Sequence, residues 1–332
     1  MSNASTDNTV VTSELDSLPT YVLTHGASGS RVVIARRGAT VLSWAAPWKG
    51  EMGDFMEGFI SEEDFTGQAG MRNGLLFPFA NRLRDASYTW DGVTYTVPMQ
   101  CAGDPETIHG FVRLHDWELV ASELDSPEAA RLTFTYSIRE GEYEWYPFSL
   151  DIAVTYELTA TSLNVSFAYK NVGTSDAPAN FGWHPYYKIP GHDVIDDLAL
   201  RVPAHTQVET DEALIPLPGD AAYSPLPGEL WHETLEDVHY DTAFADLVAD
   251  GDGIVRTYLT EGDRGAGLSL WQERGTVLVY TEGKFPHYRG SIAIEPVEST
   301  TDAFNREDRD AEVRLAPGAE RIFRFGATVI GE

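Results

Sequence analysis

The chain has 332 residues, of which 42% are hydrophobic, so it can bury a sizeable core as one large β domain or two ordinary domains. Its 52 acidic and 23 basic side chains give a formal net charge of −29, which argues against nucleic acid or an anionic membrane as a partner. The sequence has a single cysteine, Cys101, and no apolar run long enough to span a membrane, so we expect a cytoplasmic protein without intrachain disulfides.

The first eighteen residues are rich in Ser, Thr and Asn and have neither the basic start nor the apolar stretch of a signal peptide. We predict a disordered tail over residues 1–18, followed by a single domain over residues 19–332. No internal repeat and no long linker divides this domain.

Hydrophobic and polar residues alternate with a period of two through most of the chain, which predicts half-buried strands. The predicted strands cover residues 31–36, 116–122, 131–138, 150–158, 163–170, 254–260, 267–272, 276–281, 291–295 and 312–330. Asp91-Gly92, between Ser87–Trp90 and Val93–Thr96, indicates a hairpin with a type I′ turn. Short helices are expected at 61–66 and near 126–131. This pattern predicts an all-β fold, a large antiparallel sandwich with few short helices.

The segment Asn180-Phe181-Gly182-Trp183-His184-Pro185-Tyr186-Tyr187 carries the strongest chemical signal. Its histidine titrates near neutral pH and can donate and accept a proton in one reaction cycle. A carboxylate, Glu295, stands before Pro296 at the end of the apolar run Ile292-Ala293-Ile294. A histidine and a glutamate held in this way suit a proton-transfer enzyme, although a core histidine and a strand-end glutamate would show the same pattern.

Three further segments accompany these motifs. Phe79-Ala80-Asn81-Arg82 and Ile108-His109-Gly110-Phe111 precede the histidine motif, and Tyr240-Asp241-Thr242-Ala243-Phe244 lies between it and Glu295. In this order the segments resemble those of the aldose 1-epimerase (galactose mutarotase) family, over roughly residues 20–330. Gly-Trp-His-Pro-Tyr is the specific element of the resemblance. Many members have a second glycine after the first histidine, whereas this chain continues from Gly110 to Phe111, as divergent branches of the family do.

The resemblance implies a two-sheet supersandwich whose concave face holds a sugar, and an isomerase that interconverts the α and β anomers of an aldohexose. It assigns Glu295 as the base at the anomeric hydroxyl and His184 as the acid at the ring oxygen. His109 would bond to the ring oxygen or help to set the charge of the site. Further substrate contacts would come from Asn81, Arg82 and Asp241, and we expect Phe285 to line the site.

This chemistry requires neither a metal nor a nucleotide cofactor. The sequence contains no phosphate-binding glycine-rich loop, and its other histidines lack the spacing of metal ligands. The glutamate must be ionised and the histidine charged, and we expect their proximity to favour these charge states. We expect Trp183 and Tyr186 to pack around His184 rather than to contact the sugar.

Three alternatives remain open at this point. A mutarotase for a charged sugar, such as a hexose 6-phosphate or a sulfonated hexose, would need an additional cation in the pocket, for which Arg113 is the candidate. A glycoside hydrolase or polysaccharide lyase would use paired carboxylates, which Glu295 and Asp241 could form, but the histidine motif would be unexplained. A non-catalytic sugar-binding module would not need both the acid and the base. We predict a neutral aldohexose as substrate, because the net charge of −29 disfavours anionic substrates at long range. We also expect a monomer or a homodimer.

Overall fold

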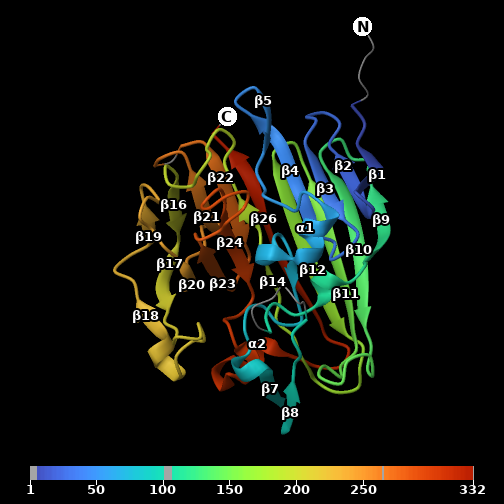
Figure 1. The fold of residues 1–332 in the computed structure, drawn as a ribbon, viewed down its shortest axis with the longest axis vertical. Helices are drawn as coiled ribbons and strands as arrows, with labels where there is room; N and C mark the ends of the chain where they lie inside the picture. Colours follow the sequence, from blue (N-terminus) through green and yellow to red (C-terminus); the bar gives the residue numbers. More distant parts are fainter. Residues whose placement is uncertain (1–5, 101–106, 264, 332) are drawn as a thin grey trace.

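Two large antiparallel sheets and a smaller third one form the body of the protein in the computed structural model, which describes residues 6–100, 107–263 and 265–331. The nine-stranded sheet runs across the full width of the molecule (Figure 1). In spatial order its strands are β19 (Leu230–His232), β16 (Ala199–Val202), β21 (Val255–Thr260), β22 (Gly267–Gln272), β26 (Glu320–Ile330), β12 (Ser162–Asn171), β11 (Leu150–Leu158), β10 (Ala130–Ile138) and β9 (Glu118–Glu123).

The eight-stranded sheet supplies most of the strands that carry the motifs. Its strands are β18 (Tyr223–Pro225), β17 (Ala204–Val208), β20 (Asp241–Leu247), β23 (Thr276–Tyr280), β24 (Ile292–Val297), β14 (Gly182–Trp183) and β6 (Leu75–Leu76), with β15 (Tyr186–Tyr187) also paired to β24. The five-stranded sheet contains β1 (Thr9–Leu15), β2 (Leu18–Thr24), β3 (Arg31–Ala35), β4 (Val41–Trp48) and β5 (Glu51–Asp54).

Short elements complete the described part of the chain. Two strand pairs stand apart from the large sheets: β7 (Ser87–Trp90) with β8 (Val93–Thr96), and β13 (Ala177–Pro178) with β25 (Arg314–Leu315). The helices are α1 (Glu62–Gly67), α2 (Asp310–Val313) and the 3₁₀ turns Ala69–Met71, Arg84–Ala86, Val112–Leu114, Gly219–Ala222, Ala303–Asn305 and Glu307–Arg309. In the part of the chain that the structure describes, no helix is long and apolar enough to cross a membrane.

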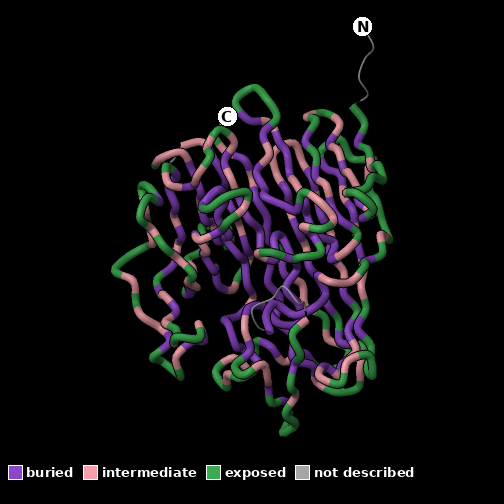
Figure 2. Tube along the Cα trace, in the orientation of Figure 1, coloured by how far each residue is buried: buried purple, intermediate pink, exposed green. Residues whose placement is uncertain are grey.

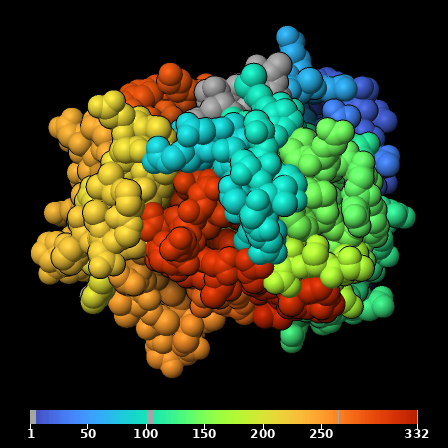
Figure 3. Space-filling view, turned by 90° about the horizontal axis from the view of Figure 1, so that it is seen from below, coloured from blue at the N-terminus to red at the C-terminus, as the bar shows by residue number. Residues whose placement is uncertain are grey.

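Aromatic side chains join the layers into one core. Phe167 of β12 stacks on Phe181 at 3.8 Å between ring centroids, and Tyr21 of β2 meets the edge of Phe134 of β10 at 5.4 Å. Figure 2 shows that the buried chain is concentrated where the strands cross the middle of the molecule. Seen from below, the chain near residue 90 lies against the chain near residue 300 (Figure 3), where Asn305 Nδ2 donates to the Ser87 carbonyl at 2.8 Å.

The all-β, antiparallel fold class is confirmed, and so are most of the local predictions. The alternating segments form β10, β11 and β12, and the Asp91-Gly92 turn has the two positive φ angles, 48° and 82°, of a type I′ hairpin. The helix predicted at 61–66 is α1, whose N-cap Ser61 accepts a hydrogen bond from the Asp64 N–H.

Two local predictions are wrong. A disordered tail over residues 1–18 is excluded for its second half, because β1 pairs with β2 along its whole length and the Asn8 side chain donates to the carbonyls of Ser126 and Leu124. Residues 1–5 lie outside the described chain, as does Cys101. The helix expected near 126–131 is absent, because β10 begins at Ala130, which pairs with Leu158 of β11.

Candidate active site

The main chain of His184 is held from both sides by the segment that leads into β6. Its N–H donates to the Gly74 carbonyl at 3.1 Å, and its carbonyl accepts from the Asn73 N–H at 2.8 Å. On one face the imidazole stacks on the Tyr186 ring, with centroids 5.1 Å apart and an interplanar angle of 10°. The histidine ring is therefore fixed in orientation by its backbone and by its neighbour.

Glu295 lies within β24, opposite Leu278 of β23, and is only 1% exposed. Its Oε1 is 3.3 Å from His184 Nε2. The two residues that stand 111 positions apart in the chain thus form a direct pair at hydrogen-bonding distance. Strand pairing creates this proximity, because β24 lies between β14 and β23 in the sheet.

His109 and Asn81 hold each other in a left-handed backbone conformation, with φ of 64° and 61°. The Asn81 N–H donates to His109 Nδ1 at 3.0 Å, and the His109 N–H donates to the Asn81 carbonyl at 3.0 Å. Because Nδ1 accepts this bond, a neutral His109 carries its proton on Nε2 and can donate from there. Gly110 is required beside it, since φ is +61° and a Cβ would lie 2.1 Å from the Phe77 carbonyl oxygen.

Asn81 also positions the arginine that follows it. Its Oδ1 accepts from the Arg82 N–H at 2.8 Å and from Arg82 Nη1 at 3.1 Å. Asp241 opens β20 and pairs in register with Tyr280 of β23. Together these residues line a pocket of about 160 Å³, whose walls are formed by Gly70, Met71, Asn81, Arg82, Ile108, His109, His184, Tyr186, Asp241, Leu278, Tyr280 and Glu295.

The structure brings six of the eight residues proposed from the sequence into this pocket, and it excludes Arg113 and Phe285 from the wall. Arg113 is 0% exposed, and its Nη1 donates to Gln68 Oε1 at 3.2 Å. The prediction that Arg113 contacts a charged sugar is therefore wrong. Phe285 is partly exposed and lies against the guanidinium of Arg72, whose Cζ is 4.2 Å from the ring centroid, and near the edge of Tyr186. A Cβ on Gly70 would meet the Phe285 ring at 2.4 Å.

Burial sets the protonation of the central pair. It lowers the pKa of His184 to about 3, with a further lowering by the nearby charge of Arg113. Burial, with a contribution from Asp241, raises the pKa of Glu295 well above its usual value. The expectation that proximity makes the histidine charged and the glutamate ionised is therefore corrected, because desolvation disfavours both charges. Burial therefore favours the uncharged form of each residue.

His109 is also neutral. Burial lowers its pKa well below the usual value, and electrostatic interactions with His184, Arg113 and Arg82 act in the same direction. A neutral His109 with its proton on Nε2 can serve as a fixed hydrogen-bond donor.

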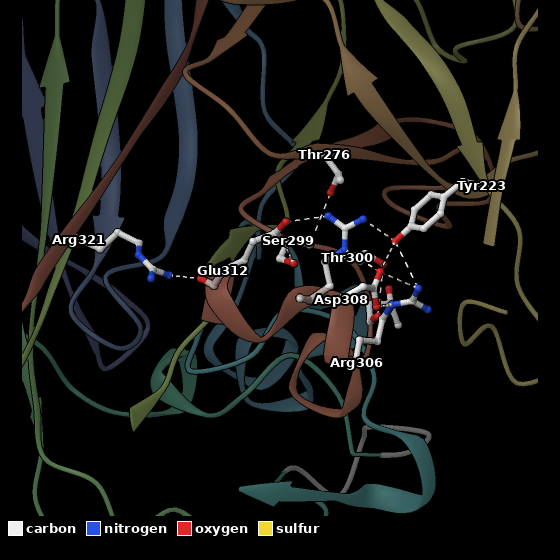
Figure 4. A network of polar contacts seen from close by, with 10 residues as sticks. Tyr223, Thr276, Ser299, Thr300, Arg306, Asp308, Glu312 and Arg321 are labelled. Atoms are coloured by element: carbon white, nitrogen blue, oxygen red, sulfur yellow. Dashed lines mark hydrogen bonds and ion pairs between the residues drawn. The ribbon is translucent and has the colours of Figure 1, made fainter. Parts of the chain in front are cut away.

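A larger cavity, of about 750 Å³, lies away from this site and contains none of the residues proposed from the sequence. Its polar groups bond mainly to one another: Arg309 Nη2 donates to the Tyr223 hydroxyl at 2.6 Å, and Ser299 Oγ donates to Glu312 Oε2 at 2.6 Å (Figure 4). The histidine and carboxylate side chains proposed for the chemistry lie in the smaller pocket. Among the described residues no group of three or more His, Cys, Asp and Glu side chains could hold a metal ion.

Several residues of the site were not anticipated from the sequence. Tyr186 packs on His184 as expected but also lines the pocket, together with Leu278 and Tyr280. The alternation within residues 276–281 places Leu278 and Tyr280 on one face of a strand. It does not reveal that this face lies beside Glu295, which depends on the pairing of β23 with β24.

Comparisons with known proteins agree with this picture. A family model described as Aldose 1-epimerase matches residues 19–326. The uncharacterized protein YihR of Escherichia coli K12 is 27% identical over 242 residues, which cover 70% of this chain and 71% of that protein. An Aldose 1-epimerase of the same organism is 27% identical over 212 residues, which cover 61% of this chain and 58% of the relative.

Two solved structures have the same fold. A galactose 1-epimerase from Lactobacillus acidophilus aligns with a TM-score of 0.78 at 19% identity, covering 99% of this chain and 100% of the other. A galactose mutarotase-like protein from Clostridium acetobutylicum aligns with a TM-score of 0.79 at 15% identity, with the same coverage. The supersandwich architecture of the chain is therefore shared with these proteins.

Proposed function

Since the chain belongs to the aldose 1-epimerase family, whose model matches residues 19–326, we propose that it interconverts the α and β anomers of a neutral aldohexose. The observation that carries this proposal is the 3.3 Å contact between His184 Nε2 and Glu295 Oε1 in the wall of a pocket. Mutarotation needs one group that takes a proton and one that gives a proton, and this pair supplies both.

The reaction proceeds by two proton transfers that are reversed on reclosure. The reactive form of the pair has Glu295 ionised and His184 protonated, and it is a minor form because burial favours the neutral residues. In this form Glu295 takes the proton of the anomeric hydroxyl while His184 protonates the ring oxygen. The bond between C1 and the ring oxygen breaks, and C1 becomes an aldehyde. After rotation about the C1–C2 bond, the ring hydroxyl adds to the other face of the aldehyde, and each proton returns to its source. Acid–base assistance of this kind contributes about 10² to 10⁴-fold to a rate.

The surrounding polar residues bind and orient the sugar. Arg82, held by the Asn81 carboxamide, donates to a sugar hydroxyl. Asp241 accepts hydrogen bonds from two adjacent hydroxyls, and His109 donates from Nε2 to the ring oxygen. These contacts hold the anomeric centre against the pair, which is how positioning contributes to such a reaction.

A neutral substrate is favoured by the charges around the pocket. Arg82 is the one cationic side chain in the wall, within the described part of the chain, and the carboxyl groups of Asp241 and Glu295 line the same pocket. The guanidinium of Arg113, which a phosphate or sulfonate would need, is buried behind this wall. Screening limits the influence of the overall charge of −29 to about 8 Å at physiological salt. The charged groups next to the pocket therefore determine whether a neutral or a charged sugar is preferred.

The proposal is tested by following the optical rotation of freshly dissolved α-D-glucose, α-D-galactose and their 6-phosphates with the purified protein. We expect faster mutarotation of at least one neutral sugar and a lower catalytic efficiency for its 6-phosphate. A rate equal to the spontaneous rate for every sugar would refute the proposed activity. A higher efficiency for a 6-phosphate would refute the neutral substrate.

A further inference from the structure

Asn73 is completely buried and bonds to three residues of the catalytic histidine segment. Its N–H donates to the His184 carbonyl at 2.8 Å, and its carbonyl accepts from Trp183 Nε1 at 2.9 Å. Its Oδ1 accepts from the Tyr186 N–H at 2.9 Å. The residue thus contacts the chain immediately before, at and after His184, although it is absent from the pocket wall.

The other end of the Asn73 side chain is anchored outside this segment. Nδ2 donates to the carbonyl of Val41 in β4 at 2.9 Å and to the carbonyl of Glu57 at 3.0 Å. The carboxamide therefore has both donors and its acceptor satisfied within the buried interior. It connects the five-stranded sheet rigidly to the histidine segment.

The backbone at Asn73 explains why this residue type is needed. Its φ is +57°, a conformation that glycine adopts freely and that asparagine tolerates better than other residues with a side chain. Glycine would satisfy the backbone but would leave the Tyr186 N–H without its acceptor. Aspartate would keep the acceptor but lose both donors. Asparagine meets the two requirements together.

We propose that Asn73 is a positioning residue for the acid–base pair, acting through Tyr186 and the main chain of His184. The Tyr186 N–H is fixed by Asn73 Oδ1, the Tyr186 ring stacks on the His184 imidazole at 5.1 Å, and His184 Nε2 reaches Glu295 at 3.3 Å. Displacing Tyr186 therefore displaces the imidazole relative to the carboxyl group. A misplacement of about 1 Å at a reacting centre can lower a rate by about 10²-fold.

This inference rests on the proposed mutarotase activity, and the structure offers a matched control for its test. Asn171, at the end of β12, is equally buried and makes the same three kinds of side-chain bond away from the pocket. Its Nδ2 donates to the carbonyls of Ser175 and Leu315 at 2.8 and 2.7 Å, and its Oδ1 accepts from the Gly173 N–H at 2.9 Å. Asn171→Gly therefore removes a similar set of bonds without touching the histidine segment.

The experiment compares Asn73→Gly with Asn171→Gly in kcat, KM, Tm and the imidazole ¹⁵N signals of His184, which are assigned with His184→Asn. Both variants should have a lower Tm. Asn73→Gly should lower kcat about 10 to 100-fold with KM within about threefold, as loss of positioning predicts. It should also shift the His184 ¹⁵N signals, whereas Asn171→Gly should leave kcat and these signals unchanged.

The proposal is overturned if Asn73→Gly loses no more kcat than Asn171→Gly, if its loss lies mainly in KM, or if the His184 signals stay in place. Should Asn73→Gly not fold, Asn73→Ser, which also withdraws the acceptor from the Tyr186 N–H, takes its place with the same expectation. If the wild-type protein does not mutarotate any sugar, the proposed function fails. The ¹⁵N signals of His184 then decide the positioning role independently.

Discussion

The buried imidazole of His184 couples the stability of the fold to pH, and His184→Asn should weaken this coupling. The pKa of His184 is about 3 in the folded protein, against 6.5 for an ordinary histidine. Because the folded value is the lower one, the unfolded state gains a proton below pH 6.5 that the folded state does not bind. The contribution of this pKa difference to the free energy of unfolding is fully present above pH 6.5 and is lost progressively as the pH falls toward 3.

The size of the effect follows from the same two values. A difference of about 3.5 in pKa corresponds to roughly 5 kcal/mol over the whole range, or about 1.4 kcal/mol for each pH unit between the two values. Glu295 acts in the opposite direction, because its pKa is higher in the folded protein than in the unfolded chain. This difference stabilises the folded state at pH values below the pKa of the unfolded chain, and the stabilisation is lost as the pH rises through the pKa of the folded protein. His184→Asn removes the histidine contribution alone.

Urea unfolding followed by tryptophan fluorescence, at several pH values from 4.5 to 7.5, measures this contribution. The free energy of unfolding of the wild-type protein should rise with pH more steeply than that of His184→Asn, by about 1.4 kcal/mol per pH unit below 6.5. His205, exposed on β17, provides the control, and His205→Asn should retain the wild-type slope. Equal slopes for the wild type and His184→Asn would refute the conclusion that burial keeps His184 neutral.

Three further outcomes are expected in the mutarotation assay. Exhaustive EDTA treatment should leave the rate unchanged, because the acid–base pair requires no metal, and a loss of rate that one added metal restores would contradict the mechanism. His184→Asn should still bind galactose or glucose by calorimetry but lose turnover, whereas His109→Asn should bind more weakly and keep a partial rate; the reverse pattern would exchange their roles. Arg113→Ala should raise the pKa of His184, as followed by the imidazole ¹⁵N signals, because the Arg113 charge lowers it, and should not change the preference for glucose over glucose 6-phosphate. A phosphate preference that Arg113→Ala abolishes would place Arg113 in contact with the substrate.

Much of the fold could be predicted from the sequence because its signals are local. The period-two alternation that defines β10, β11 and β12 is a property of each strand alone. The Asp91-Gly92 turn carries its own backbone preference. The resemblance to a family then linked His184 to Glu295, which local patterns could not do.

The features that were missed depend on tertiary structure. The pairing of β1 with β2 is invisible in a polar segment whose residues remain mostly exposed. Whether Arg113 points into a pocket or away from it depends on the packing of the chain around it. The pKa shifts of His184 and Glu295 follow mainly from desolvation, which has no signature in the sequence. Asn73 became visible only through its hydrogen bonds.

The most direct measurement of the central claim is the mutarotation rate of Glu295→Gln, followed by the optical rotation of fresh α-D-glucose and α-D-galactose. The amide has the shape of the carboxyl group but cannot exchange a proton with His184 Nε2 at neutral pH. Glu298, three positions further along the chain and outside the pocket wall, gives the control variant Glu298→Gln. With a folded protein in each case, we predict that Glu295→Gln loses about 10² to 10⁴-fold in rate while Glu298→Gln retains the wild-type rate. A Glu295→Gln protein that keeps most of the wild-type rate would contradict the assignment of the pair as the catalytic acid and base.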